Sequence, residues 1–88
     1  MQFEYDREKS EANKAKHGID FEEAQALWDD NTVCARLRYK AEPRYAYVGT
    51  INGKCWTAMI TYRGFNVRII SVRRSRKDEE RIYHERIQ

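Results

Sequence analysis

Arginine residues crowd the last third of the sequence, around a stretch whose alternating pattern predicts a β-strand at Val67–Arg73. This strand holds Arg68 and Arg73, with Arg63 shortly before it and Arg74 directly after it. Strict alternation would place Arg68 and Arg74 on one side of the strand and Arg73 on the other. An arginine at a strand end packs its aliphatic stem and extends a fork of donors that suits phosphate. The four arginines together therefore predict a phosphate-binding surface. For any single arginine, an ion pair to an acidic helix is an equally good explanation.

Two further side chains could take part in cleaving RNA. His17 ends a charged helix and could act as a general acid or base, or it could simply cap the helix in a Lys-His-Gly turn. Tyr62 precedes Arg63 at a turn and could touch a substrate, whereas the other aromatic residues fit packing better. Cleavage by attack of the ribose 2′-OH on the adjacent phosphate needs only cations and a group that moves a proton.

Motifs for other chemistries are missing from the sequence. It has no glycine-rich phosphate loop, no paired catalytic carboxylates and no nucleophile elbow. The two histidines and two cysteines have no zinc-binding spacing, so we expect neither a metal nor another cofactor. Cys34 and Cys55 are expected to be free thiols.

A short strand and a charged helix are predicted first. Phe3–Tyr5 alternates as a strand does, and Asp6 suits the N-cap of a helix over residues 7–16. Ala12 and Ala15 would give this helix a narrow apolar contact. Gly18 suits the residue that follows its C-terminus.

A second helix is predicted from Asp20 to about Trp28. Asp20 and Glu23 have the spacing of a capping box. Its apolar side chains fall on one helical face, which indicates packing on a sheet. They are Phe21, Ala24, Leu27 and Trp28.

The remaining sequence predicts four antiparallel strands and a final helix. The strands are Thr32–Arg38, Arg44–Ile51, Cys55–Tyr62 and Val67–Arg73, with a type I′ turn at Asn52-Gly53. Ser75 and Asp78 would open a C-terminal helix ending near Arg86. The whole arrangement is α+β: a short N-terminal strand, two helices, a four-stranded antiparallel meander and a C-terminal helix. Two helices would cover one face of the sheet and leave the other open or covered by a partner.

The length and charge of the chain limit its number of domains and its possible partners. Residues 1–88 suffice for a single domain and are too few for two. Residues 1–43 carry seven Lys and Arg against ten Asp and Glu, whereas residues 44–88 carry ten against four. This asymmetry suggests a basic half that faces a polyanion, although a solvated basic face explains the charge alone equally well. No uncharged run is long enough for a membrane span, and the N-terminus does not read as a signal peptide, so we expect a cytoplasmic protein.

Several segments resemble the BrnT family. They are Phe3-x-Tyr5-Asp6-x-x-Lys9, Asn13, Lys16-His17-Gly18-Ile19-Asp20-Phe21, Arg44-Tyr45, Thr61-Tyr62-Arg63 and Arg68-Ile69-Ile70-Ser71-Val72-Arg73-Arg74. The resemblance implies a ribonuclease toxin of a type II toxin–antitoxin pair with a RelE-like fold. It also implies a BrnA-like ribbon-helix-helix antitoxin, which would form a hetero-oligomer with the toxin. Operator DNA would then be contacted only through the antitoxin. Tyr5 stands where the family usually carries Trp, and Val72 where it carries Ala.

Candidate site residues follow from the arginine pattern and the resemblance together. We expect Arg63, Arg68 and Arg73 to bind and stabilise the scissile phosphate, and His17 or Tyr62 to transfer a proton. Flanking phosphates would be held by Arg44, Lys54, Arg74, Arg76 and Lys77. The alternative is a non-catalytic module, such as a degraded toxin, that only binds nucleic acid or an antitoxin.

Overall fold

The computed structural model describes residues 2–29, 31–37 and 41–87, and the α+β class is confirmed. Its elements are β1 (Gln2–Glu4), α1 (Arg7–His17), η1 (Glu23–Asp29), β2 (Val33–Leu37), β3 (Arg44–Ile51), β4 (Lys54–Arg63), β5 (Asn66–Arg74) and α2 (Lys77–Ile87). The predicted strand end at Arg38 lies outside the described residues. Cys34 and Cys55 are free thiols, as expected.

All five strands form one sheet in the order β1-β5-β4-β3-β2. The predicted antiparallel meander of β2 to β5 is confirmed. The sheet as a whole is mixed, however, because β1 pairs in parallel with β5 and places Glu4 beside Arg68. The turn between β3 and β4 has positive φ at Asn52 (52°) and Gly53 (78°), which is the expected type I′ conformation.

The limits of α1 agree with the capping signals, but its packing differs from the prediction. Asp6 Oδ1 accepts hydrogen bonds from the backbone N–H groups of Glu8 and Lys9, and Gly18 takes the left-handed conformation at φ 84°. The expected contact through alanines is wrong, since Ala12 and Ala15 are both exposed. The buried residues of α1 are instead polar, Ser10 and Asn13.

Asn13 fixes α1 to β5 by hydrogen bonds to the backbone. Its Nδ2 donates to Val72 O at 2.9 Å and to Ile19 O at 2.8 Å, while Val72 N donates to its Oδ1 at 3.2 Å. The pairing of β1 with β5 ends at Arg68, so the edge of β5 beyond that residue needs another partner. The amide of Asn13 supplies that partner at Val72, which explains how a strongly charged helix packs without an apolar stripe.

The second predicted helix exists, but η1 is a 3₁₀ helix rather than an α-helix. Phe21, Ala24 and Leu27 are spaced by three residues and are all fully buried. A repeat of three matches the 3₁₀ helix, in which side chains at i and i+3 lie in line. The predicted capping box is confirmed, since Asp20 N donates to Glu23 Oε1 and Glu23 N donates to Asp20 Oδ1.

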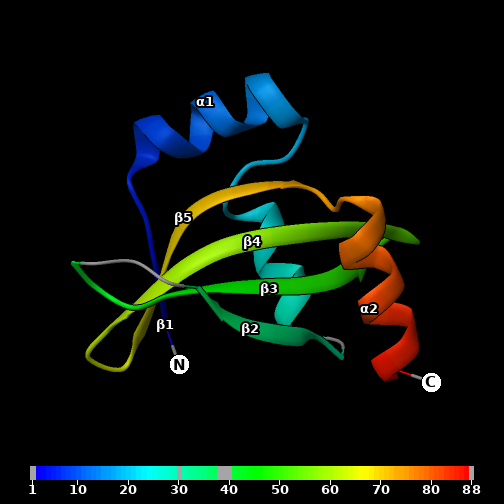
Figure 1. Cartoon of the computed structure of the whole chain (residues 1–88). Helices are drawn as coiled ribbons and strands as arrows, with labels where there is room; N and C mark the ends of the chain where they lie inside the picture. Colours follow the sequence, from blue (N-terminus) through cyan, green and yellow to red (C-terminus); the bar gives the residue numbers. More distant parts are fainter. Residues whose placement is uncertain (1, 30, 38–40, 88) are drawn as a thin grey trace.

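The helices lie on both sides of the sheet (Figure 1). The face that contacts η1, called the core face here, carries most of the buried apolar side chains, including Trp56, Ala58 and Ile60. The opposite face was expected to be open or covered by a partner, yet α2 packs across one end of it, with Tyr83 against Val48. No helix in the described parts of the chain is long and apolar enough to cross a membrane.

The start of α2 also differs from the prediction. Ser75 does not cap the helix, because its hydroxyl bonds to the Thr57 hydroxyl at 2.8 Å. The capping carboxylate is that of Glu79, which accepts from Arg76 N at 2.7 Å, rather than that of Asp78. The capping signal is therefore displaced by one residue, and Glu79 comes to face the sheet.

Candidate functional site

A β-bulge in β5 decides on which face its arginines lie. Ile60 pairs with Ile69 but the preceding Met59 pairs with Ser71, so Ile70 is an extra residue without a partner on β4. Each bulge shifts the alternation of side chains by one residue. The strict alternation assumed from the sequence is therefore wrong beyond Ile69.

The bulge brings Arg68 and Arg73 to the same face. Arg68 pairs with Thr61 and Arg73 with Thr57, and these two threonines are four residues apart on the regular strand β4. Arg63, two residues after Thr61, points to that face as well. We call the face that carries Arg63, Arg68 and Arg73 the arginine face; it is the face on which α2 packs.

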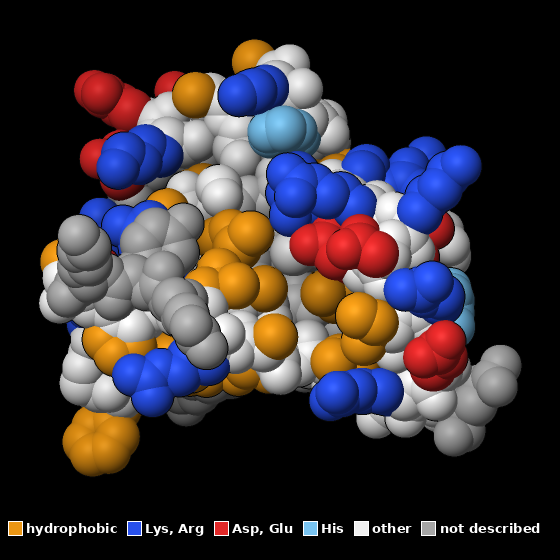
Figure 2. All heavy atoms as spheres, viewed as in Figure 1, with side chains coloured by type: hydrophobic (Ala, Val, Ile, Leu, Met, Phe, Trp, Pro, Cys, Tyr) orange, Lys and Arg blue, Asp and Glu red, His pale blue; other side chains and the backbone are white. Residues whose placement is uncertain are grey.

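The arginine face is an extended surface. Arg68 and Arg73 are separated by about 13 Å along the sheet, as four residues of β4 span. Figure 2 views this face and shows hydrophobic side chains in its middle with Lys and Arg side chains around them. An extended row of cations on a sheet suits a polymeric ligand better than a small one.

Arg73 is held by α2. Its Nη1 and Nη2 donate to Oε1 and Oε2 of Glu79 at 2.8 and 2.9 Å, and both side chains are 21% exposed. Glu79 also accepts from Arg76 N and from the buried hydroxyl of Thr57. The hydrogen bond from Arg73 lowers the pKa of Glu79 to about 2, and Glu79 in turn raises the pKa of Arg73. The pair stays ionised across the physiological range.

Arg68 has a looser partner. Its Nη1 lies 3.6 Å from Oε2 of Glu4 on the neighbouring strand β1, and both side chains are about one-third exposed or less. Such a pair is worth little by itself, since the charges remain in contact with water. Arg68 can therefore exchange this carboxylate for a phosphate at small cost.

Arg63 ends β4 and is exposed. Within the described residues no carboxylate pairs with it. Counting ion pairs among the described residues, the three arginines form a graded set: Arg63 has none, Arg68 has a long one, and Arg73 has a tight bidentate one.

His17 comes to this region from the acidic half of the chain. It is half-buried and lies four residues after Asn13, so the two side chains share one side of α1. Asn13 bonds to Val72, the residue before Arg73. Figure 1 shows α1 and β5 running in the same direction, so the C-terminal end of α1 lies over the end of β5 that carries Arg73.

Tyr62 lies apart from these residues. It pairs with Val67, so it points to the core face, where its hydroxyl bonds to that of Tyr47 at 2.5 Å and its ring packs on Tyr45. Burial and the hydrogen bond to Tyr62 raise the pKa of Tyr47. The structure does not bring Tyr62 together with the three arginines.

The predicted flanking cations divide between two regions. Arg44 pairs with Leu37 and joins the arginine face, and Arg76 and Lys77 stand at the start of α2 near Arg73. The other two lie toward the core face. Arg74 covers the Trp56 ring at 5.4 Å and donates from Nε to Cys55 O, and Lys54 borders a hollow with Trp56.

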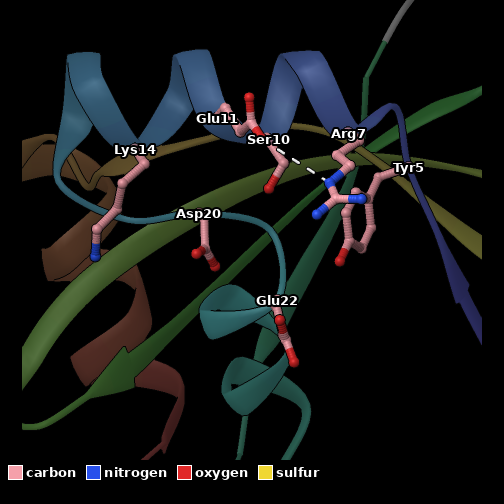
Figure 3. Close-up of a pocket in the computed structure, with 7 residues that line it drawn as sticks. All are labelled: Tyr5, Arg7, Ser10, Glu11, Lys14, Asp20 and Glu22. Carbon is pink, nitrogen blue, oxygen red and sulfur yellow. Dashed lines mark ion pairs between the residues drawn. The ribbon is translucent and has the colours of Figure 1, made fainter.

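A separate pocket of about 310 Å³ lies between α1 and the segment leading to η1 (Figure 3). It is lined by Tyr5, Arg7, Ser10, Glu11, Lys14, Asp20 and Glu22. Its charges are mixed, with a long ion pair between Arg7 and Glu11 at 3.9 Å. None of the predicted site residues lines it, so the arginine face remains the candidate site.

Sequence reasoning missed two residues that position the site. Glu79 holds Arg73, and Asn13 holds α1 against β5. Glu79 carried a usable signal, because a glutamate three residues after Arg76 in a helical start favours capping. Asn13 was marked only as part of the resemblance to a known family, and no local signal indicated its anchoring role, since its partners are 6 and 59 residues away in the sequence.

Comparison with known proteins places the chain beside a known family. A family model described as the ribonuclease toxin BrnT of type II toxin–antitoxin systems matches residues 5–79. The matched range contains His17, the three arginines and Glu79. None of the curated proteins compared with the chain matches it.

Proposed function

The chain belongs to the BrnT family of ribonuclease toxins of type II toxin–antitoxin systems, and on this premise we propose that it is a metal-independent endoribonuclease that cleaves RNA and arrests translation. The observation that carries the proposal is the β5 bulge, which aligns Arg63, Arg68 and Arg73 on one face. A single-stranded polyanion can lie along that row, since its phosphates need spaced cations and little shape complementarity.

The reaction starts with attack of a ribose 2′-OH on the adjacent phosphorus. The 2′ oxygen–phosphorus bond forms, the bond to the 5′ oxygen breaks, and the products are a 2′,3′-cyclic phosphate and a 5′-OH. Negative charge accumulates on the phosphoryl oxygens in the transition state, where guanidinium donors stabilise it. Arg68 is well suited because its ion pair to Glu4 is long, while Arg73 keeps donors that Glu79 does not occupy.

Proton transfer is assigned to His17. An imidazole can take the proton from the 2′-OH at neutral pH, and a proton then reaches the leaving 5′ oxygen. The anchoring of α1 through Asn13 supports this choice, because it holds the helix that ends at His17 against Val72, the residue before Arg73. Tyr62 is the weaker candidate, since it points to the other face and bonds to Tyr47.

A type II toxin has an antitoxin partner. We propose a BrnA-like ribbon-helix-helix protein that forms a hetero-oligomer with this chain in the cytoplasm and contacts operator DNA. The part of the arginine face that α2 leaves open and the outer edge of β2, the last strand of the sheet, are available to it in the described part of the chain. A RelE-like architecture is part of the same proposal, supported by the antiparallel meander flanked by helices.

A non-catalytic module is the second candidate. The observation that favours it is the pairing of Arg68 and Arg73 with carboxylates, which reduces the positive charge available to a phosphate. Such a module would bind RNA or the antitoxin without cleaving RNA.

Analysis of the RNA products separates the two candidates. Purified chain is incubated with unstructured RNA in the presence of EDTA, and the ends of the products are identified. Fragments with 2′,3′-cyclic phosphate and 5′-OH ends support the proposed ribonuclease. Intact RNA that is nonetheless retarded in a gel supports the binding module.

A further inference from the structure

Phe65 is a large apolar residue on the surface, at a turn position that does not need one. It is 97% exposed at the tip of the β4–β5 hairpin. Arg63 pairs with Asn66, and Gly64 has φ 60° while Phe65 has no positive φ, so Gly64-Phe65 is a two-residue turn of the II′ kind. Only the glycine is demanded by such a turn. The ring of Phe65 neither packs on another aromatic ring nor joins an apolar cluster of the described residues.

Polar side chains suited to a nucleotide lie on the strand residues at the base of this hairpin tip. Gln2 pairs with Asn66, and Asn66 with Arg63, so the three form a row across β1, β5 and β4 at the end of the arginine face. The row offers two amides, each with donors and an acceptor, and one guanidinium. Gln2 and Arg63 are exposed and Asn66 is half-buried.

We propose that this end of the arginine face is a base-binding subsite, in which an unpaired RNA base stacks on Phe65. The amides of Gln2 and Asn66 hydrogen-bond to the edge of that base, and Arg63 holds the adjoining phosphate. Single-stranded RNA is commonly bound by aromatic stacking combined with hydrogen bonds to base edges.

Spacing connects the subsite to the rest of the face. Arg68 follows Asn66 by two residues on β5, a separation of about 7 Å. A base on Phe65 and a phosphate at Arg68 can therefore belong to the same or neighbouring nucleotides. The subsite would then influence which nucleotide is placed beside the reacting phosphate. This inference rests on the proposed action on RNA and adds the residues that select the base.

Protein partners also use exposed aromatic residues and arginines as binding hot spots. The row of Gln2, Asn66 and Arg63 favours RNA, because it holds no carboxylate and its amides match base edges. Docking of the antitoxin on Phe65 is therefore an opposing outcome of the test.

The test measures binding of a single-stranded 2′-O-methyl oligonucleotide, which lacks the 2′-OH nucleophile and so stays intact. Phe65→Ala and Phe65→Leu should each weaken binding about 5- to 150-fold, the range for loss of one stacked base. Leucine keeps an apolar side chain but has no π face. Both variants should unfold at the temperature of the wild type, since the side chain of Phe65 is 97% exposed. Ile87→Ala, an exposed apolar residue at the end of α2, should bind as the wild type does.

Fluorescence gives a direct view of the stacking. Phe65→Trp should bind the oligonucleotide with an affinity near that of the wild type. Its added emission, measured above that of Trp28 and Trp56, should be quenched on binding. The wild type should also prefer one of four homo-oligonucleotides, and Asn66→Ala should reduce that preference.

Three results would overturn the subsite. They are wild-type affinity in Phe65→Ala, unquenched added emission of Phe65→Trp in a complex with RNA, and loss of antitoxin binding in Phe65→Ala with RNA binding intact. Equal affinity of the wild type for all four homo-oligonucleotides would show that the amides of Gln2 and Asn66 do not distinguish between bases. If the wild type cleaves RNA in EDTA while Phe65→Ala binds normally, only this inference fails. If the wild type neither binds nor cleaves RNA, the proposed function fails with it.

Discussion

Arg73 on β5 and Glu79 on α2 form a bidentate ion pair, with one hydrogen bond from each Nη at 2.8 and 2.9 Å. The pair ties the last helix to the sheet at one end of the arginine face. It also places a negative charge directly on a guanidinium that is proposed to hold phosphate. Stability of the fold and affinity for RNA should therefore respond in opposite directions when Glu79 is changed.

Glu79→Gln should lower the free energy of unfolding by about 1–3 kcal/mol, because the charged bidentate hydrogen bonds of a partly buried arginine are lost. The same variant should bind single-stranded RNA more tightly, since a negative charge is removed from Arg73. Urea unfolding and oligonucleotide titration measure the two quantities. Glu85→Gln on the exposed side of α2 is the matched control and should leave stability nearly unchanged. Unchanged stability in Glu79→Gln would show that the ion pair contributes nothing.

Low pH should remove the contribution of Glu79 to the free energy of unfolding. Its pKa is about 2 in the folded chain, mainly because of Arg73, and 4.5 is the ordinary value that we take for the unfolded chain. A lowered folded pKa stabilises the fold above pH 4.5, and this stabilisation is lost as the pH falls toward 2. The wild type should lose up to about 2 kcal/mol between pH 5 and pH 3 relative to Glu79→Gln. Urea unfolding of both proteins at several pH values measures this difference, and parallel profiles would contradict the lowered pKa.

Asn13→Ala should destabilise the fold by about 2–4 kcal/mol. The variant leaves Val72 N, Val72 O and Ile19 O without their side-chain partner, and buried polar groups without partners are costly. Urea unfolding gives the value, and Glu11→Ala, exposed on α1, provides the comparison. A loss no larger than that of Glu11→Ala would mean that Asn13 does not hold α1 to the sheet.

His17→Ala should lower the single-turnover rate of RNA cleavage by about 10²- to 10⁴-fold, the usual effect of removing a general acid or base. Tyr62→Phe should lower it less than about threefold, since Tyr62 bonds to Tyr47 on the other face. His84→Ala tests for a general effect of losing an exposed imidazole and should behave as the wild type. A large loss of cleavage rate in Tyr62→Phe together with a near-normal rate in His17→Ala would contradict the assignment and indicate that Tyr62, on the core face, transfers the proton.

Local sequence signals located the elements well. Asp6, Gly18 and the Asp20–Glu23 capping box act through neighbouring backbone groups, so their positions could be predicted and were confirmed. The Asn52-Gly53 turn is equally local. Features that depend on distant residues were not predicted. The parallel pairing of β1 and the polar anchoring by Asn13 join segments more than fifty residues apart.

The site shows the same division between local and distant causes. The residue types of Arg63, Arg68 and Arg73 indicated phosphate binding, but their common face depends on a bulge that no local signal marks. The 3₁₀ form of η1 was visible as the spacing of Phe21, Ala24 and Leu27, which also fits an α-helix over so short a segment.

The most direct test of the central claim compares cleavage rates of the arginine variants. Arg63→Ala, Arg68→Ala and Arg73→Ala are assayed under single-turnover conditions in EDTA on one single-stranded RNA, with Arg86→Ala on the exposed end of α2 as the control. Arg68→Ala and Arg73→Ala should each reduce the rate by about 10²- to 10³-fold, as loss of a transition-state donor does, and Arg63→Ala should mainly weaken binding. Rates for all three variants equal to that of Arg86→Ala would contradict a catalytic role for the arginine face.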